Sequence, residues 1–259
     1  MARLHDSYVT RFSVRQRTEH LLIMGLFLLL AVTGFPQKFF ESGWAQWLTV
    51  QLGGIDRARW IHRISGILFT LVAVEHLSVG VALAAMKRLN ITMVPSKKDF
   101  WDAIVTLRYY LGVSEEQAQF DRYDYRQKFE YWGLVLGGMV MIATGFLLYF
   151  PIFFTHFLPG EVIPAAQVAH SNEGLLAFLV VLIWHIYNAH LNPDVFPMDP
   201  SIFSGKVSEE RMIKEHPLEH ARLQAVRTQG PAGQTNGLHQ SEIKESEPSS
   251  GKLPPPCKS

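Results

Sequence analysis

Four histidines lie inside two strongly apolar stretches of the chain and share a repeated spacing. His62 and His76 are fourteen residues apart, and His170 and His185 are fifteen apart. Neutral imidazole is polar at both ring nitrogens, so inside a membrane it must be hydrogen-bonded or bound to a metal ion. Fourteen or fifteen residues correspond to about 21 to 22 Å of helical rise. Each pair of histidines is therefore expected to point into one half of the protein at two different depths.

Four apolar segments have close to the length of about 20 residues that a helix needs to cross a bilayer. They predict an integral membrane protein of the all-α class, a four-helix transmembrane bundle with interfacial helices. The composition agrees: 48% of the residues are hydrophobic, although a polar C-terminal stretch holds the mean hydropathy at +0.08. The predicted spans are 19–35, 60–86, 131–154 and 163–191.

The charges of the connecting segments predict the orientation, because Lys and Arg are enriched on the cytoplasmic side. Four arginines precede the first span, and eight Lys and Arg residues lie between the second and third spans. The connection 151–162 contains no Lys or Arg. Both termini are therefore expected to be cytoplasmic, and the first span to be retained because no small-residue cleavage site follows it.

The cysteine content limits the cofactors. The single cysteine, Cys257, excludes an intramolecular disulfide, a CxxC metal site and covalent attachment of haem through CxxCH. A bound metal must therefore be held by histidine. A zinc or copper site would gather its ligands at one depth, whereas these histidines are spread over two, which favours two stacked haems. Membrane lipid is an expected partner and nucleic acid is not.

The spacing leaves one pairing open. His62 and His170 are expected at similar depth near the outer surface and form the natural outer pair. At the inner level His185 can be completed by His20, which stands at the mouth of the first span, or by His76. The histidine that remains is a candidate to hydrogen-bond a quinone or to relay a proton.

Other polar residues near the histidines have weaker predicted roles. Arg17, Arg59 and Arg63 flank the expected ligands and are candidates to bind haem propionates or, equally, lipid headgroups. Glu75 is a candidate to exchange protons with quinone, to hydrogen-bond a ligand imidazole or to join two helices. His190 is expected to face the headgroups.

The segments outside the spans are expected to lie at the membrane surface. Residues 39–52 predict an interfacial helix, and 99–112 a surface helix that docks a partner or roofs a quinone pocket. A Pro-punctuated loop and a charged helical stretch follow the fourth span. The transmembrane domain is predicted to cover 1–222, and 223–259, which has few large apolar residues, to form a disordered cytoplasmic tail.

Five motifs occur in order: RQRTEHLL, LAVTGFP, RWIHRISGI, FEYWGLVLGGMVMIATGFLLYFP and AHSNEGLLAFLVVLIWHIYNAHL. Over about residues 11–220 they resemble the four-helix cytochrome b family of formate dehydrogenase gamma subunits and nickel-iron hydrogenase cytochrome b subunits. The resemblance implies two haems b with bis-histidine ligation, exchange of electrons with menaquinone or ubiquinone near the cytoplasmic side, and location in the bacterial inner membrane. It implies pairing of His20 with His185 and of His62 with His170.

Two features depart from the family pattern. The fourth-span spacing is one residue longer than in the formate dehydrogenase type, and His76 has no counterpart there. His76 is similar to the paired histidines of the quinol-oxidising cytochrome b fold. The stretch 195–223 resembles a branch encoded beside multihaem c-type cytochromes. The resemblance thus implies a hetero-oligomeric complex with a periplasmic redox subunit, either a multihaem cytochrome c or an iron-sulfur protein.

The predicted function is that of a dihaem subunit of a respiratory oxidoreductase, which transfers electrons between the quinone pool and a periplasmic partner. It would not be a complete enzyme alone. Bis-histidine coordination leaves no open iron position, which suits electron transfer and disfavours oxygen chemistry. The alternative is a haem-free membrane transporter or assembly anchor whose intramembrane His and Glu carry protons. Such transporters typically distribute charges through several spans and break helices at mid-depth.

Overall fold

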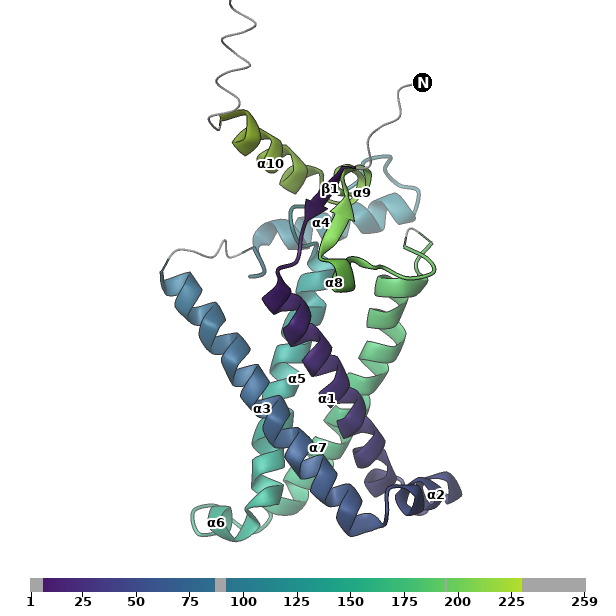
Figure 1. Ribbon diagram of the computed structural model, residues 1–259, viewed down its shortest axis with the longest axis vertical. Helices are drawn as coiled ribbons and strands as arrows, with labels where there is room; N and C mark the ends of the chain where they lie inside the picture. The colour runs from purple at the N-terminus through teal and green to yellow at the C-terminus, as the bar shows by residue number, and fades with distance from the viewer. Residues whose placement is uncertain (1–6, 87–91, 194, 230–259) are drawn as a thin grey trace, which may run out of the picture.

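The structure is a computed structural model that describes residues 7–86, 92–193 and 195–229, and it confirms the predicted four-helix bundle (Figure 1). We call the end with α4 and α8 to α10 the inner end, and the end with α2 and α6 the outer end, after the orientation predicted from the charges. The elements in chain order are β1 (Tyr8–Thr10), α1 (Val14–Lys38), α2 (Gly43–Gln51), α3 (Ile55–Ala85), α4 (Lys97–Tyr110), α5 (Tyr125–Tyr149), α6 (Pro151–Thr155), α7 (Val162–Leu179), the π-helical segments η1 (Val180–His185) and η2 (Tyr187–Leu191), α8 (Ser201–Ser204), β2 (Lys206–Ser208), α9 (Glu209–Glu215) and α10 (Pro217–Gln229).

Three spans, α1, α3 and α5, begin five or six residues earlier than predicted, and capping boxes mark the starts of α1 and α5. Ser13 and Gln16 satisfy each other's backbone N–H groups at the start of α1, and Asp124 and Gln127 do so at the start of α5. The helix α5 also ends earlier than predicted, because Pro151 begins the separate short helix α6. These starts place Glu19 and Glu130 in the second turn of their helices.

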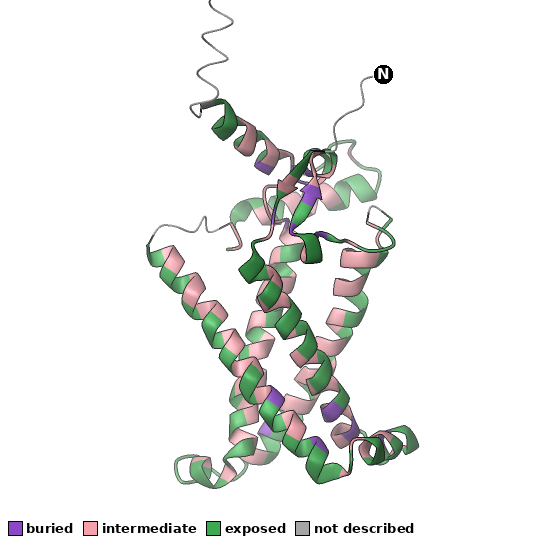
Figure 2. Ribbon diagram, viewed as in Figure 1, coloured by how far each residue is buried: buried purple, intermediate pink, exposed green. Residues whose placement is uncertain are grey.

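Few residues of the four long helices are buried (Figure 2), and the exposed side chains of these helices are largely apolar. Leu71, Val81 and Ile183, for example, have 61%, 70% and 67% of their surface exposed. Hydrocarbon solvates such a surface, and each helix satisfies its backbone hydrogen bonds internally. All four helices are long and apolar enough to cross a bilayer, and the protein is a multi-pass membrane protein.

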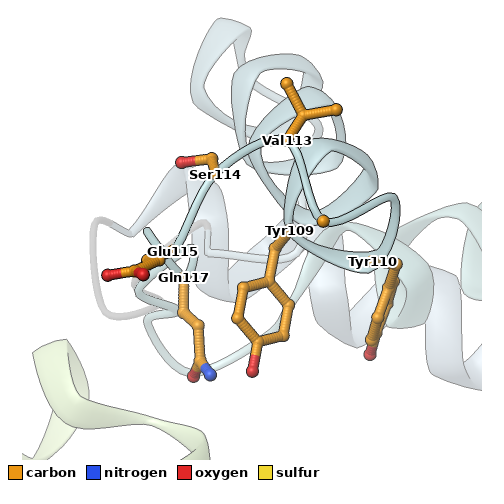
Figure 3. A pocket seen from close by; sticks show the side chains of 7 residues that line it. Tyr109, Tyr110, Val113, Ser114, Glu115 and Gln117 are labelled. Atoms are coloured by element: carbon orange, nitrogen blue, oxygen red, sulfur yellow. The ribbon is translucent and has the colours of Figure 1, made fainter.

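Short helices lie at both ends of the bundle, as predicted. The helix α2 occupies the expected interfacial segment at the outer end, and α4 lies across the inner end with Phe100, Trp101 and Tyr110 exposed (Figure 1). A shallow pocket of about 860 Å³ adjoins the end of α4 (Figure 3). Histidine is absent from its lining residues, which are Tyr109, Tyr110, Gly112, Val113, Ser114, Glu115 and Gln117.

The inner end carries a small cap that the sequence did not predict. The strand β1, from the expected basic lead-in, pairs antiparallel with β2, and Tyr8 lies opposite Ser208. The backbone N–H groups of Arg11 and Phe12 then donate to the Gly205 carbonyl at 2.8 and 3.1 Å. The helix α10 continues to Gln229, past the domain boundary predicted at 222. The predicted disorder beyond 229 concerns residues outside the described part.

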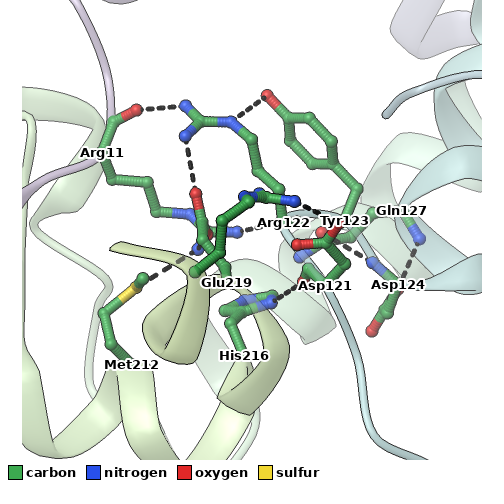
Figure 4. A network of polar contacts seen from close by, with 10 residues as sticks. Arg11, Asp121, Arg122, Tyr123, Asp124, Gln127, Met212, His216 and Glu219 are labelled. Carbon is green, nitrogen blue, oxygen red and sulfur yellow. Dashed lines mark hydrogen bonds and ion pairs between the residues drawn. The ribbon is translucent and has the colours of Figure 1, made fainter. Parts of the chain in front are cut away.

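A buried ion cluster holds this cap together (Figure 4). The carboxylate of Glu219 on α10 is 3% exposed and accepts from Arg11 at 3.1 Å and from Arg122 at 2.8 Å. Each arginine also donates to the backbone carbonyl of the other at 2.5 Å. The cluster therefore ties three distant segments together: the residues before α1, the loop before α5, and α10.

Replacing Glu219 with Gln should destabilise the cap, because it leaves the buried Arg11 guanidinium without a counter-charge. Breaking a buried ion pair from one side typically costs about 3–5 kcal/mol. We expect a lower thermal unfolding midpoint in detergent and faster trypsin cleavage near Arg11. Glu210→Gln, an exposed change on α9, is the matched control. Identical midpoints for the two variants would contradict the assignment.

The cap also contains a titratable histidine. His216 is 6% exposed, and its Nδ1–H donates to the Asp121 carbonyl at 2.6 Å. Burial, helped by the nearby Arg11 charge, lowers the pKa of His216 below its ordinary value of 6.5. The folded cap thus favours neutral imidazole, and the stability present above about pH 6.5 is lost as the pH falls through the folded-state pKa.

We therefore expect the thermal unfolding midpoint to decrease as the pH is lowered from about 7.5 to 5. This decrease should be smaller in His216→Gln. His156→Gln, at an exposed histidine of the outer end, should keep the parent's pH response. Thermal unfolding followed across this pH range provides the measurement. Equal pH responses in the two variants would show that His216 does not control the transition.

Candidate functional site: two histidine pairs in the bundle

The predicted outer histidines face each other across the bundle. His62 on α3 and His170 on α7 have ring centroids 6.2 Å apart and ring planes inclined at 77°. A threonine supports each ring: Thr33 Oγ1 of α1 lies 2.9 Å from His62 Nδ1, and Thr144 Oγ1 of α5 lies 3.0 Å from His170 Nδ1. Each helix that carries a histidine is thus supported by the helix that precedes it among the spans.

The threonine hydrogen bonds assign the protons on the outer rings. Thr33 Oγ1 donates its proton to the Leu29 carbonyl at 2.7 Å, and Thr144 Oγ1 donates to the Val140 carbonyl at 2.6 Å. Each hydroxyl can therefore only accept from the histidine, so Nδ1 carries the ring proton. The Nε2 atoms of both rings keep a lone pair that is suited to a metal ion.

Glycines make room for the two outer rings. A Cβ atom added to Gly34 would lie 3.0 Å from Cε1 of His62, and one added to Gly145 would lie 3.3 Å from Cε1 of His170. Ordinary contacts of a Cβ atom are longer than these distances. The glycines that follow Thr33 and Thr144 are therefore part of the outer site.

The structure also brings His20 and His185 together at the inner level. Their ring centroids are 6.0 Å apart and their planes are inclined at 33°. His185 Nδ1 donates to the Glu130 carboxylate of α5 at 2.5 Å. His20 Nδ1 is buried and has no hydrogen-bond partner, and neither has His190 Nδ1, although His190 was expected to face the headgroups.

His76 occupies a different environment at the same level. Its Nδ1 donates to the Glu19 carboxylate at 2.9 Å, and its Nε2 accepts from the Tyr131 hydroxyl at 3.0 Å. Both ring nitrogens thus have protein partners. Of the two inner pairings that the sequence left open, the structure brings together His20 and His185.

A π-helical turn positions His185. The segment η1 runs from Val180 to His185, and the Ile186 N–H donates to the Val181 carbonyl, five residues back. A π turn holds more residues than an α turn and is frequent at functional sites. The turn therefore accommodates the one residue by which the spacing from His170 to His185 exceeds that from His62 to His76. The ring of His185 consequently faces His20 and Glu130.

Of the three predicted arginines, Arg17 lies at the inner end, whereas Arg59 and Arg63 are one helical turn apart on α3 near the outer end. Arg17 donates to the Phe203 carbonyl and links the start of α1 to α8 at the inner end. Arg59 and Arg63 are exposed near the outer end, and the Arg63 guanidinium lies 5.2 Å from the Tyr149 ring centroid. Lys38, for which the sequence predicted no role, donates to Asn172 Oδ1 at 2.7 Å, two residues from His170 of the outer pair.

The supporting residues were missed, although an internal repeat in the sequence carries them. The spans α1 and α5 share six identical residues at a constant offset of 111, and both begin with a capping box. The histidine helices α3 and α7 also align around His62 and His170. The shared residues are Arg15 and Arg126, Gln16 and Gln127, Glu19 and Glu130, Thr33 and Thr144, Gly34 and Gly145, and Phe35 and Phe146.

Comparison with known proteins agrees with this geometry. Residues 11–196 match the family model described as prokaryotic cytochrome b561. The chain belongs to this family. A nitrate-inducible formate dehydrogenase cytochrome b556 subunit of Escherichia coli is 26% identical over 217 residues, which cover 83% of this cytochrome b and 92% of the relative. A formate dehydrogenase cytochrome b556 subunit of Haemophilus influenzae is 27% identical over 185 residues, or 71% and 72% of the two chains.

Family membership implies haem b, and the histidine pairs fit an iron held between two imidazoles. An imidazole nitrogen binds a first-row metal at about 2 Å, so two rings on opposite sides of one iron have centroids about 6 Å apart. Both pairs have this separation. Among the described residues, groups of three or more His, Cys, Asp and Glu side chains that could hold another metal ion are absent.

Replacing Gly34 with Ala should disturb the outer histidine pair, because the new methyl group meets the His62 ring. We expect a shifted or broadened α band in the reduced spectrum of this cytochrome b, with the protein still folded. Gly25→Ala is the matched control on the same helix, because a Cβ there meets no atom within 4 Å. A Gly34→Ala spectrum identical to that of Gly25→Ala would contradict the predicted contact.

Proposed function

We propose that this cytochrome b binds two haems b, each between two histidines. His62 and His170 hold the outer haem, and His20 and His185 hold the inner one. The observation that carries the proposal is the pair of ring separations near 6 Å at two levels, with Nδ1 of three of the four rings hydrogen-bonded by the protein. Ligating histidines almost always donate their other ring N–H in this way.

The two levels provide electron-transfer positions on both sides of the membrane. They are separated by the fifteen residues from His170 to His185, about 22 Å of helical rise. Haem b supplies one-electron iron chemistry when it is bound. Two histidine ligands leave no iron position open to substrate, so the site is suited to electron transfer.

The names of the relatives favour a role in a respiratory complex. We infer that the chain is the membrane subunit of a hetero-oligomeric oxidoreductase in the bacterial cytoplasmic membrane. It exchanges electrons with menaquinone or ubiquinone at the inner end and with a periplasmic redox subunit at the outer end. The stretch 195–223 favours a multihaem cytochrome c over an iron-sulfur protein as this partner. The subunit completes a catalytic cycle only together with it.

The residues of the chain position the cofactors and tune their environment. Thr33 and Thr144 present neutral acceptors to the outer ligands, whereas Glu130 presents a carboxylate to His185. A carboxylate acceptor makes an imidazole ligand more basic. At the outer end Arg59 and Arg63 are available for propionates. At the inner end Arg17 is the corresponding cation, with Nε buried and without a partner.

Substitution of single histidines tests the ligand assignment. We expect His62→Ala and His170→Ala to lose the outer haem, and His20→Ala and His185→Ala to lose the inner one, because one imidazole alone cannot complete the coordination. Each variant should retain about half of the parent's haem in a pyridine haemochrome assay. Reduced-minus-oxidised spectra of the same samples identify which α band disappears.

His76→Ala is the internal control, because it removes a histidine from a span without removing a proposed ligand. This variant should keep the haem content of the parent. Loss of one haem from His76→Ala with full retention in His20→Ala would overturn the inner pairing. A parent protein without haem, purified from haem-replete cells, would overturn the proposed function as a whole.

A further inference from the structure

The internal repeat gives its two glutamates, Glu19 and Glu130, different ionic surroundings. Each glutamate stands four residues after an arginine, Arg15 in α1 and Arg126 in α5, at a spacing that makes the two side chains neighbours. In α1 the pair forms, and Arg15 lies 2.6 Å from Glu19. In α5 Arg126 instead donates to Asp124, the residue that caps the helix, at 2.7 Å. In the described part of the chain Glu130 thus has no arginine partner.

The carboxylate of Glu130 is directed to the inner histidine pair. Its Oε1 accepts from His185 Nδ1 at 2.5 Å, and among the described residues it makes no ion pair with Lys or Arg. The side chain of Glu130 is 12% exposed, so little water screens its charge. Glu19, in contrast, supports His76, which is not a proposed ligand. The uncompensated carboxylate is therefore the one beside a proposed haem ligand.

Hydrogen bonds alone leave the two levels nearly equal. At the outer level both rings donate to a neutral hydroxyl oxygen, at 2.9 and 3.0 Å. At the inner level His185 donates to a carboxylate, whereas His20 Nδ1 has no partner among the described residues. A charge-assisted hydrogen bond is about twice as strong as a neutral one, so the single bond to Glu130 is equivalent to the two bonds to threonine. The levels therefore differ chiefly in the charge itself.

The outer level carries charge of the opposite sign. Lys38 Nζ lies 2.7 Å from Asn172 Oδ1 and 3.2 Å from Ser171 Oγ, the two residues that follow one outer histidine. The guanidinium of Arg63, which follows the other outer histidine, lies 5.2 Å from the Tyr149 ring centroid. Within the described residues neither cation is paired with a carboxylate. The outer level thus has uncompensated positive charge, and the inner level has the Glu130 carboxylate.

We propose that Glu130, as a positioning residue that acts through His185, holds the inner haem at a lower reduction potential than the outer one. The inference rests on the proposed function, because it assumes one haem at each level. Reduction of iron(III) to iron(II) adds one negative charge to a site. The Glu130 carboxylate opposes this charge at the inner level, whereas the Lys38 ammonium favours it at the outer level.

The ordering of the potentials bears on the direction of electron flow. One electron passes between inner iron(II) and outer iron(III), and no proton or ligand moves with it. Because the outer site has the higher potential, transfer from the inner level to the outer level is favourable. The arrangement therefore favours delivery of electrons to the periplasmic redox subunit, which would be the acceptor.

A potentiometric titration of the purified full-length haem protein, followed by α-band absorbance, tests the proposal. Glu130→Gln keeps an acceptor oxygen for His185 and removes the charge. Glu75→Gln is the matched control, because it removes a charge near the inner end of α3 where the carboxylate pairs with Arg15 and not with a proposed ligand. His62→Ala, which should retain only the inner haem, identifies the potential that belongs to that haem.

We expect the inner haem of the parent to have the lower potential. Glu130→Gln should shift the sharing of one electron toward the inner haem about ten-fold, which is about 59 mV for a one-electron couple. The outer potential and the haem content should not change, and Glu75→Gln should behave as the parent.

Two results would overturn the proposal and leave the proposed function standing, because both require a protein with two haems. One is an inner potential in the parent that equals or exceeds the outer potential, a result that needs no variant at Glu130. The other is an inner potential that Glu130→Gln moves no further than Glu75→Gln does. A parent without haem would overturn the proposed function itself, and a pyridine haemochrome assay on the same samples separates this case.

Discussion

The structure depends on the cost of leaving an imidazole nitrogen without a partner in hydrocarbon. An uncompensated polar group in an apolar environment costs several kcal/mol, so each intramembrane histidine requires a defined neighbour. The spans α1 and α5 provide these neighbours with two threonines and two glutamates. Because these groups engage Nδ1, they also fix the tautomer and the direction of four rings, those of His62, His76, His170 and His185. Helix packing and cofactor chemistry are therefore set by the same hydrogen bonds.

This constraint explains why the bundle consists of two helix pairs. The spans α1 and α3 pack along each other, as do α5 and α7, and each pair contains one supporting helix and one histidine helix. The outer level keeps the equivalence of the pairs, so one site there uses a histidine from each. The inner level breaks it with Tyr131 in place of a histidine and with one additional residue between His170 and His185. The π turn then retains the direction of His185 despite that residue.

Much of this arrangement follows from the sequence, and each feature that could not be predicted has a physical reason. The four spans were predictable because bilayer crossing requires a long apolar run, and the two levels because a helix rises by a constant distance per residue. Which histidine, His20 or His76, faces His185 was not predictable. It depends on how α1 crosses the fourth span, which helical periodicity does not encode. The strands β1 and β2 were missed because three-residue strands from opposite ends of the chain carry no local pattern.

The supporting residues show a different kind of limit. Thr33 and Thr144 are ordinary residues in apolar helices, where a hydroxyl can always bond the carbonyl four residues back. Glu19 and Glu130 were not singled out, because the predicted spans begin at 19 and 131, which leaves Glu19 at the edge of its span and Glu130 outside its span. Comparison of the chain with itself reveals all four residues at once, because the same offset of 111 relates both pairs.

The four spans are held unequally at the inner end. The cap fixes α1 and α5 through the Arg11, Arg122 and Glu219 cluster, and these two spans carry Glu19 and Glu130. The span α3 diverges from its neighbours at this end (Figure 1), where Arg15 joins it to α1 through an ion pair with the partly exposed Glu75. Such exposed pairs contribute little free energy, about 0–1 kcal/mol. At this level α3 is therefore held to α1 and α5 through His76, whose ring nitrogens hydrogen-bond Glu19 and Tyr131, and not through the exposed ion pair.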